Sequence, residues 1–310
     1  MVTTAAETAA REPTTRHDPT RRSRRLPRLF PTSMPWLIRA QVINLALLAG
    51  LALLGPSVIG HDPARQDLRA RLTAPVWIGN HANHPLGTDH IGRDVLARTV
   101  YGLRTSLIVA AIGTVVSLVI GTALGALAAL GGRAADAVVM FLVETQMSVP
   151  YTLVVLVLMA SLGTDIRVFL LVVGLAGWEG VARLVRGQLL AAKRQDFVEG
   201  ARALGLGQLR IAFRHLLPTT APILMVLASG SFTGVIFLES SLSFLGVGIQ
   251  PPATSLGLLI GVGRDHLMGA WWIALAPCAL LVSLTLSVAL LGDWLRDRLD
   301  PRARRKLTRR

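Results

Sequence analysis

The chain has 310 residues, of which 52% are hydrophobic and 16% charged, and its mean hydropathy is +0.54. A soluble domain rarely buries so much apolar surface, so the composition predicts a polytopic membrane protein. The formal net charge of +14 is concentrated in the two ends and one internal segment, which is typical of cytoplasmic segments and argues against nucleic-acid binding. The one cysteine, Cys278, lies in an apolar run, so neither a disulfide nor a cysteine-based metal site is expected.

Residues 1–34 are rich in Thr, Ala, Pro and Arg without apolar periodicity, which predicts a disordered basic cytoplasmic tail. The segment 35–60 contains an apolar run at 37–59 that is too long for a cleaved signal peptide, so we expect a first transmembrane helix. Residues 61–104 mix Pro, Asp, Arg and His and are predicted to form an external loop ending in a short interfacial helix at 94–104. The loop holds more arginine than the positive-inside rule favours outside a membrane, namely Arg65, Arg69, Arg71, Arg93, Arg98 and Arg104.

Residues 105–292 form a core for which we predict five further transmembrane helices, giving an all-α polytopic bundle of six. Residues 246–265 are expected to form an irregular stretch outside the membrane, and 293–310 a second basic cytoplasmic tail. An even number of spans places both termini on the same side of the membrane, and the basic tails indicate that this side is the cytoplasm. The five predicted spans are 107–130, 137–162, 168–190, 221–244 and a last one between the Trp271-Trp272 pair and Trp294.

Small residues recur at every fourth position of the second predicted span, where they form a ridge that another helix can approach closely. The ridge suits either dimerisation or packing inside the bundle, and we favour the second interpretation. Its members are Gly113, Ser117, Gly121, Gly125 and Ala129.

Residues 193–218 are polar and strongly basic yet patterned, between long apolar runs. Phe197, Ala201 and Leu204 share one face of a short helix, which Gly205 is expected to end. A second helix begins at Gln208, and Pro218 is expected to end it. The pattern predicts a helical hairpin on the membrane surface, offered to a soluble partner. The apolar face of the second helix comprises Leu209, Ala212, Phe213 and Leu216.

Within this hairpin, Glu199-Gly200-Ala201, then Gly205 and Leu217-Pro218, resemble the coupling-loop signature of membrane subunits of ATP-binding-cassette (ABC) importers. Gly200 departs from the family's Ala, which costs about 1 kcal/mol in a helix interior. Further motifs are similar to the second permease subunit of dipeptide, oligopeptide and nickel importers. They are His84-Pro85-Leu86-Gly87-Thr88-Asp89, Gly92-Arg93-Asp94, residues 178–188 and 242–252, Gly292-Asp293 and Leu299-Asp300-Pro301.

The resemblance implies a type I permease fold in the cell membrane, with a coupling-helix hairpin and both termini in the cytoplasm. It implies a substrate pathway shared with a homologous permease, two cytoplasmic ATP-binding subunits and an external substrate-binding protein. Di- or oligopeptides are the implied substrate, with nickel or another small solute as the alternative. The ATPase-coupling residues that it implies are Phe197, Glu199, Gly200, Ala201, Leu204, Gly205, Leu217 and Pro218.

Glu144 lies roughly 12 Å into the third predicted span at 1.5 Å per residue. A carboxylate at that depth is unfavourable unless it faces a polar cavity or a partner, so it either lines the pathway or bonds to another helix. Gln146, Met147 and Pro150 nearby are further pathway candidates. Glu239 lies near the outer end of the fifth predicted span, where it can reach the interface, so we expect it to be structural.

Catalysis by this chain is not expected, because the sequence contains no G-x-x-x-x-G-K-[ST], G-x-S-x-G or H-E-x-x-H motif. ATP would therefore be bound by another subunit, and no cofactor is expected. A secondary transporter would need inverted repeats with broken helices, and a membrane hydrolase would need a base at depth; neither pattern is present. No fixed ligand spacing links the histidines of the outer loop, so a metal site is not predicted at His61, His81, His84 and His90.

Overall fold

The computed structural model describes residues 35–60, 62–79, 83–163 and 165–299. The tail expected at 1–34 lies outside these ranges, as do residues 300–310 of the second tail. Within the described residues the fold is helical and contains no β-strand, only an isolated bridge between Thr88 and Asp94. The all-α prediction is confirmed.

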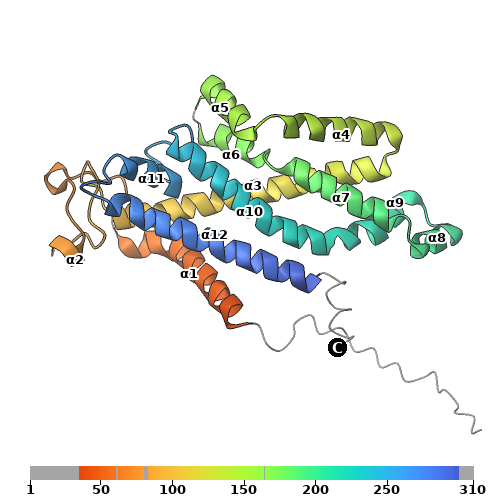
Figure 1. The fold of residues 1–310 in the computed structure, drawn as a ribbon, viewed down its shortest axis with the longest axis horizontal. Coiled ribbons are helices and arrows are strands. Elements are labelled where there is room, and N and C mark those ends of the chain that lie inside the picture. Colours follow the sequence, from red (N-terminus) through yellow and green to blue (C-terminus); the bar gives the residue numbers. More distant parts are fainter. Residues whose placement is uncertain (1–34, 61, 80–82, 164, 300–310) are drawn as a thin grey trace, which may run out of the picture. The chain divides into compact units, whose positions relative to one another are not determined.

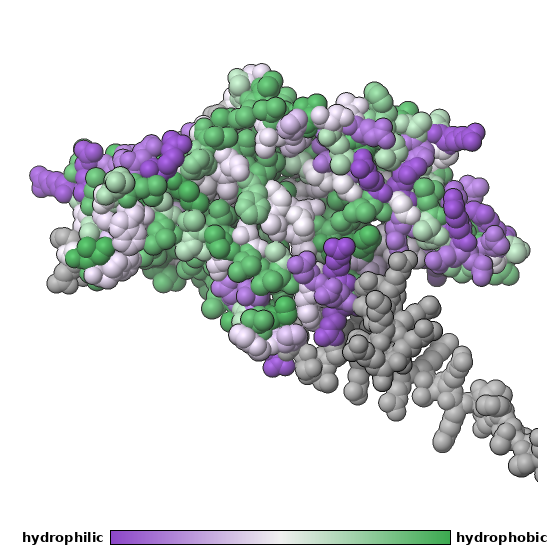
Figure 2. Space-filling model, in the orientation of Figure 1, coloured by the Kyte–Doolittle hydropathy of each residue, from purple (hydrophilic) through white to green (hydrophobic). Residues whose placement is uncertain are grey.

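Five helical segments are long and apolar enough to cross a membrane (Figure 1). Hydrophilic side chains gather over the outer loop and over the hairpin at opposite ends of these helices, with hydrophobic side chains between (Figure 2). The five segments are α1 (Trp36–Ile59), α3 (Val95–Leu130), α6 with α7 (Ile166–Gly174 and Trp178–Ala192), the run Gln208–Phe244 that includes α10 (Ala221–Phe244), and α12 (Trp272–Leu299).

The third predicted span, 137–162, is a bent pair of helices, α4 (Arg133–Ser148) and α5 (Tyr151–Leu162), which meet at 85°. Pro150 lies at the break and lacks the amide hydrogen that an unbroken helix would need. Val149 before it is extended, with φ −114° and ψ 130°, as the residue preceding a proline prefers. The third predicted span is therefore broken at this proline, and when the pair is counted as one span the described residues contain six.

The interfacial helix expected at 94–104 does not form as a separate element. Asp94 caps α3 by accepting a hydrogen bond from the Ala97 amide at 2.8 Å, and the helix then runs for 36 residues without a break. Its first turns are buried, including Val95, Val100 and Leu103, so tertiary packing keeps them in line with the span.

Helix α3 contacts α1, α4, α6, α7, α10, α11 and α12, and its small-residue ridge explains how. A Cβ added at Gly125 would lie 2.5 Å from the Ala182 carbonyl oxygen of α7, and one at Gly121 would lie 2.5 Å from Val181 Cβ. Gly113 approaches Val235 of α10 in the same way. The ridge serves packing inside the bundle, as the favoured interpretation predicted.

Short helices cover the two ends of the bundle (Figure 1). At the end near α2 and α11, the outer loop and the segment after α10 lie close together, whereas α8 and α9 stand at the other end. The remaining elements are η1 (Leu68–Ala70), α2 (Val76–Gly79), α8 (Asp196–Ala203), α9 (Gln208–Ile211), η2 (Ala212–Leu216), η3 (Leu217–Thr220) and α11 (Leu256–Arg264).

Candidate functional site

The hairpin between α7 and α10 has the turn that the sequence predicted. Gly205 has φ +76°, the left-handed conformation that a residue with a Cβ adopts only at a cost. The Leu206 amide donates to the Ala201 carbonyl at 3.2 Å and the Gly205 amide to the Arg202 carbonyl at 2.9 Å. These two bonds form a Schellman motif, which ends α8 and turns the chain towards α9.

Pro218 does not end the second helix, contrary to the prediction. The chain stays helical through the π turn of η2 and the 3₁₀ turn of η3, and Gln208–Phe244 is one helical run of 37 residues. In the π turn the Leu217 amide bonds to the Ala212 carbonyl five residues back. Pro218 then occupies the beginning of η3, a position where its missing amide hydrogen does not interrupt the helix.

The residues expected to share one face of α8 separate in the structure, because Ala201 is buried whereas Phe197 and Leu204 are exposed. Val198 and Ala201 of α8 are buried with Ile211 and Leu216 in a cluster that includes residues of α3 and α7, among them Val185. By contrast, four large apolar side chains of the hairpin are exposed, and we call this set the apolar knob. Their exposed fractions are 42% for Phe197, 84% for Leu204, 76% for Leu209 and 70% for Phe213.

The predicted coupling residues therefore fall into two groups. Glu199 and Gly200 are exposed on α8 beside Phe197, and Leu204 and Gly205 follow at its turn. Leu217 and Pro218 lie together at the start of η3, beyond the π turn. The sequence placed Leu209 and Phe213 on the apolar face of the second helix but not among the coupling residues, and the structure shows both of them exposed.

An apolar groove of about 1170 Å³ lies between the hairpin and the adjacent half of α3. Leu118 and Leu127 form one wall, and Phe213 and Leu216 the other, with Lys193 at its polar edge. The hairpin is thus packed against the bundle on one side and open to the groove on another.

The four pathway candidates, three in α4 and Pro150 at the break after it, separate into two kinds. Gln146 accepts a hydrogen bond from Trp178 Nε1 at 2.7 Å and donates to Glu179 Oε2 at 3.0 Å, so it ties α4 to α7. Glu144, Met147 and Pro150 are exposed. Gln146 therefore has a packing role, which the sequence could not show because its partners lie 32 and 33 residues away.

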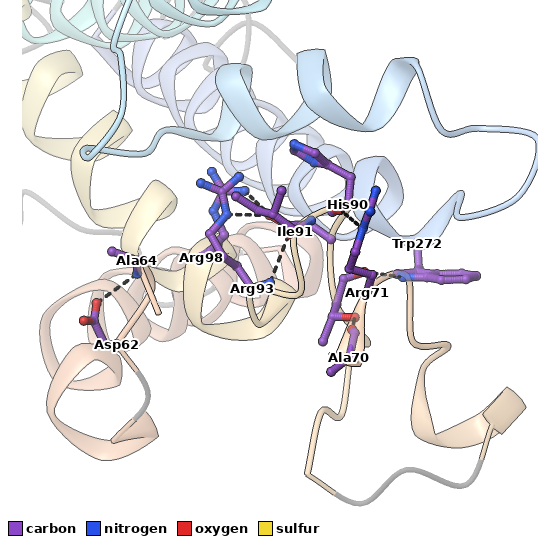
Figure 3. Close-up of polar contacts among 11 residues, drawn as sticks. Asp62, Ala64, Ala70, Arg71, His90, Ile91, Arg93, Arg98 and Trp272 are labelled. Carbon is purple, nitrogen blue, oxygen red and sulfur yellow. Dashed lines mark hydrogen bonds and ion pairs between the residues drawn. The ribbon is translucent and has the colours of Figure 1, made fainter. Parts of the chain in front are cut away.

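At the end of the bundle opposite the hairpin, the motif containing Thr88 and Asp89 forms a compact polar network. The buried Asp89 carboxylate accepts hydrogen bonds from the Ile91 and Arg93 amides at 3.0 Å, from Arg93 Nε at 2.7 Å and from Arg98 Nη1 at 2.5 Å (Figure 3). Trp272 Nε1 at the start of α12 donates to the Thr88 carbonyl at 3.2 Å. The outer loop is thereby fixed to both α3 and α12, and two of its arginines are paired with a carboxylate.

Burial raises the pKa of the Asp89 carboxyl, but its hydrogen bonds from Arg93 and Ile91 and the charge of Arg98 outweigh burial and hold that pKa below its ordinary value. Burial also lowers the pKa of His90, against the opposing charge of Asp89. His84 Nδ1 lies 2.9 Å from Asp94 Oδ2. His61 and His81 fall outside the described residues, and within those residues no three potential metal ligands are grouped.

A family model described as "Binding-protein-dependent transport system inner membrane component" matches residues 121–305, which include the hairpin. The chain is 40% identical over 270 residues to a putative peptide permease protein of Brucella suis, covering 86% of this chain and 88% of that protein. It is 36% identical over 271 residues to the dipeptide transport system permease protein DppC of Bacillus subtilis, and this match covers 87% of this chain and 83% of that protein. The chain belongs to this family of ABC importer permeases.

The fold of the permease is similar to that of a chain in an inward-facing structure of the MetNI methionine ABC transporter. The TM-score is 0.53 at 22% identity, with 65% of this permease and 96% of that chain covered. This likeness confirms the predicted type I permease fold. A permease of this family is a multi-pass membrane protein of a transport system rather than an enzyme, and it works with ATP-binding subunits and a substrate-binding protein.

Replacing Asp89 by Asn is expected to destabilise the permease strongly. Removing one partner of a buried ion pair leaves the other charge uncompensated, here on the buried Arg98, which costs about 3–5 kcal/mol. Because folding lowers the pKa of Asp89, its contribution is complete above the ordinary carboxyl pKa of about 3.9 and is lost as pH falls through the folded value. Thermal unfolding of the detergent-purified protein, from neutral to acid pH, measures both effects.

Asp265→Asn is the matched control, because Asp265 pairs at 3.1 Å with Arg264 on the exposed surface. Exposed pairs contribute little, so this variant should unfold at the wild-type temperature. Equal melting temperatures for Asp89→Asn and Asp265→Asn would contradict the structural role given to Asp89.

Proposed function

We propose that this permease imports di- or oligopeptides, pairs with a homologous permease around a shared pathway, and is driven by two cytoplasmic ATPases that grip its hairpin. The observation that carries the coupling role is the apolar knob, which stands at the end of the bundle opposite the outer loop (Figure 1). The peptide substrate is supported by the names of the relatives in Brucella suis and Bacillus subtilis.

The knob has the make-up of a protein–protein contact. Grouped exposed apolar side chains are unfavourable in water and usually mark an interaction site. Charged side chains surround them, giving the apolar centre and polar rim that interfaces share. These exposed rim residues are Arg194, Glu199, Arg202, Arg210 and Arg214.

The hairpin is also built to pass on movement. Its second half is continuous with α10, so a displacement of Leu209 or Phe213 must displace the same helical run. The groove beside α3 leaves room for the hairpin to shift on its open side. ATP-driven closure of the two ATPases would then move this run and change which side of the pathway is open.

We assign the homologous permease and the pathway to the exposed sides of α4, α5 and α10. In the most apolar 18-residue stretch of Gln208–Phe244, only 11% of the residues are buried. The corresponding share is 17–50% in the other four segments that could cross a membrane. Glu144 and Met147 are exposed on α4, where a carboxylate needs a polar cavity or a partner. In this arrangement Glu144 lines the pathway, and the chain itself carries out no catalysis.

We also propose that both termini and the hairpin lie in the cytoplasm, with the substrate-binding protein delivering its cargo to the outer loop. The Lys and Arg residues of the two ends and of the hairpin support this orientation, because the positive-inside rule counts these residues.

Gly205→Val is expected to weaken docking of the ATPases. The left-handed conformation costs a residue with a Cβ about 1–2 kcal/mol, so the turn and the knob shift while every span stays intact. Co-purification of the ATPases with the tagged permease should fall, and uptake of a labelled dipeptide should be lost with it. Full ATPase recovery together with full uptake would contradict the coupling role of the hairpin.

The control for this variant is Gly200→Ala. No atom lies within 4 Å of a Cβ added at Gly200, and Ala favours the interior of α8 by about 1 kcal/mol. ATPase recovery and uptake should equal or slightly exceed the wild-type values.

Cysteine labelling of whole cells tests the orientation. Cys278 is exposed and is first replaced by Ser, after which single cysteines are introduced at Gln66 in the outer loop and Gln208 in the hairpin. An impermeant maleimide should label position 66 in intact cells and position 208 only after the cells are opened. The reverse pattern would overturn the proposed topology.

Glu144→Gln and Glu144→Ala should both assemble with the partner subunits, because the side chain is exposed, and both should transport poorly because the charge is lost. The control Gln146→Ala removes a buried bridge to Trp178 and Glu179 and should lower the melting temperature instead. Uptake and thermal unfolding separate the two effects. Normal uptake by Glu144→Gln would refute the pathway role.

A further inference from the structure

Glu239 of α10 is fully buried and does not reach the outer interface, contrary to the expectation from the sequence. Its carboxylate accepts hydrogen bonds from Ser243 Oγ at 2.8 Å, Ser106 Oγ at 3.0 Å and Ser240 Oγ at 3.3 Å. The Ser255 hydroxyl, at the N-cap of α11, faces the same carboxylate. One side chain thus gathers hydroxyl groups from α3, α10 and α11, a set that we call the serine clamp.

The serine clamp holds backbone as well as side chains. Ser106 Oγ accepts a hydrogen bond from the Leu256 amide at 3.3 Å, and Ser243 Oγ accepts one from the Ile249 amide at 3.2 Å. Both amides belong to residues 245–256, which we call the outer segment because it connects α10 to α11 at the end of the bundle opposite the hairpin (Figure 1). The carboxylate therefore orients the two hydroxyls that fasten the outer segment to α3 and α10.

Close backbone packing adds to these bonds. A Cβ added at Gly257 would lie 2.5 Å from both the Cα and the carbonyl oxygen of Ser240. Such contact leaves α11 and the outer end of α10 no space to slide past each other. A buried carboxylate is unfavourable unless its hydrogen-bond partners are held in place. Loss of one serine partner therefore destabilises the whole serine clamp.

Glu239 and the apolar knob belong to the same helical run. Gln208 and Glu239 are separated by about 46 Å along it, at 1.5 Å per residue. A helix joined by backbone hydrogen bonds over that length transmits a push at one end to whatever is fastened at the other. The serine clamp is what fastens the outer segment there.

We propose that Glu239 is a positioning residue for transport: it makes the outer segment move together with α10, so that displacement of the hairpin reaches the outer end of the pathway. This inference rests on the proposed coupling role of the hairpin. With the clamp broken, the ATPases still dock and hydrolyse ATP, but α10 moves without the outer segment and substrate is not released inwards.

The experiment compares Glu239→Gln and Glu239→Ala in proteoliposomes containing the full transporter and its substrate-binding protein. ATPase recovery and ATP hydrolysis should stay near wild type, whereas peptide taken up per ATP hydrolysed should fall roughly 5- to 150-fold in Glu239→Ala, the range of typical coupling energies. Glu239→Gln keeps the shape and one acceptor oxygen, so its loss should be smaller. Ser57→Ala, at an exposed position on α1, should leave the ratio unchanged.

A second comparison uses Ser106→Ala alone and together with Glu239→Gln. Residues of one hydrogen-bond network are non-additive, so the double variant should be little worse than the more impaired single variant. An unchanged ratio of uptake to hydrolysis in Glu239→Ala and Glu239→Gln would overturn the proposal, as would loss of ATPase recovery in Glu239→Gln. A different result would refute the coupling role of the hairpin, on which this proposal rests: normal ATPase recovery and uptake in Gly205→Val, in which Glu239 is unchanged.

Discussion

A hydrogen bond from the Leu217 amide to the Ala212 carbonyl keeps the chain helical as it approaches Pro218, and the proposed mechanism depends on that continuity. If the helix ended at Pro218, the hairpin would be a surface loop connected to the fifth span by a flexible joint. Instead the π turn extends the helix across the proline, and the knob becomes the end of a rod. π turns inside helices are rare and often occur at functional sites, which agrees with a role at this position.

The bundle around this rod is held by two different kinds of contact. Along α3, glycines allow backbones to approach within van der Waals distance, which suits a membrane interior where apolar side chains gain little by leaving lipid. At the outer end, buried carboxylates organise polar networks instead, with Asp89 fixing the outer loop and Glu239 fixing the outer segment. Glu239 bonds to Ser106, which is 133 residues away, whereas Arg98, the most distant partner of Asp89, is nine residues away. The result is an outer end rigid enough to receive a movement that begins at the hairpin.

Features that depend on local chemistry could be predicted from the sequence. Hydropathy located the membrane spans. Pro150 marks the position where the third span breaks, and Gly205 marks the left-handed turn of the hairpin. Features that depend on packing partners could not. The continuation past Pro218 requires a π turn, which the residue pattern does not indicate. Val198 and Ala201 of α8 are buried because they pack in one cluster with residues of α3 and α7, and the spacing of Phe197 and Leu204 does not show this.

The two carboxylates illustrate the same limit. The depth of Glu239 in its span was predictable, but its direction was not, because α11 must fold back before Ser255 can meet it. Asp89 was recognisable as part of a family motif, yet the motif did not reveal that Arg93 and Arg98 converge on it (Figure 3).

Site-specific photo-cross-linking from the hairpin tests the coupling role most directly. A photoreactive amino acid at Leu204, the most exposed member of the knob, is activated in membranes that contain the whole transporter. We predict a covalent adduct with the ATPase subunit, and none when the same amino acid is placed at Met268, which is exposed at the outer end. An adduct with the substrate-binding protein, or no ATPase adduct from position 204, would contradict the coupling role.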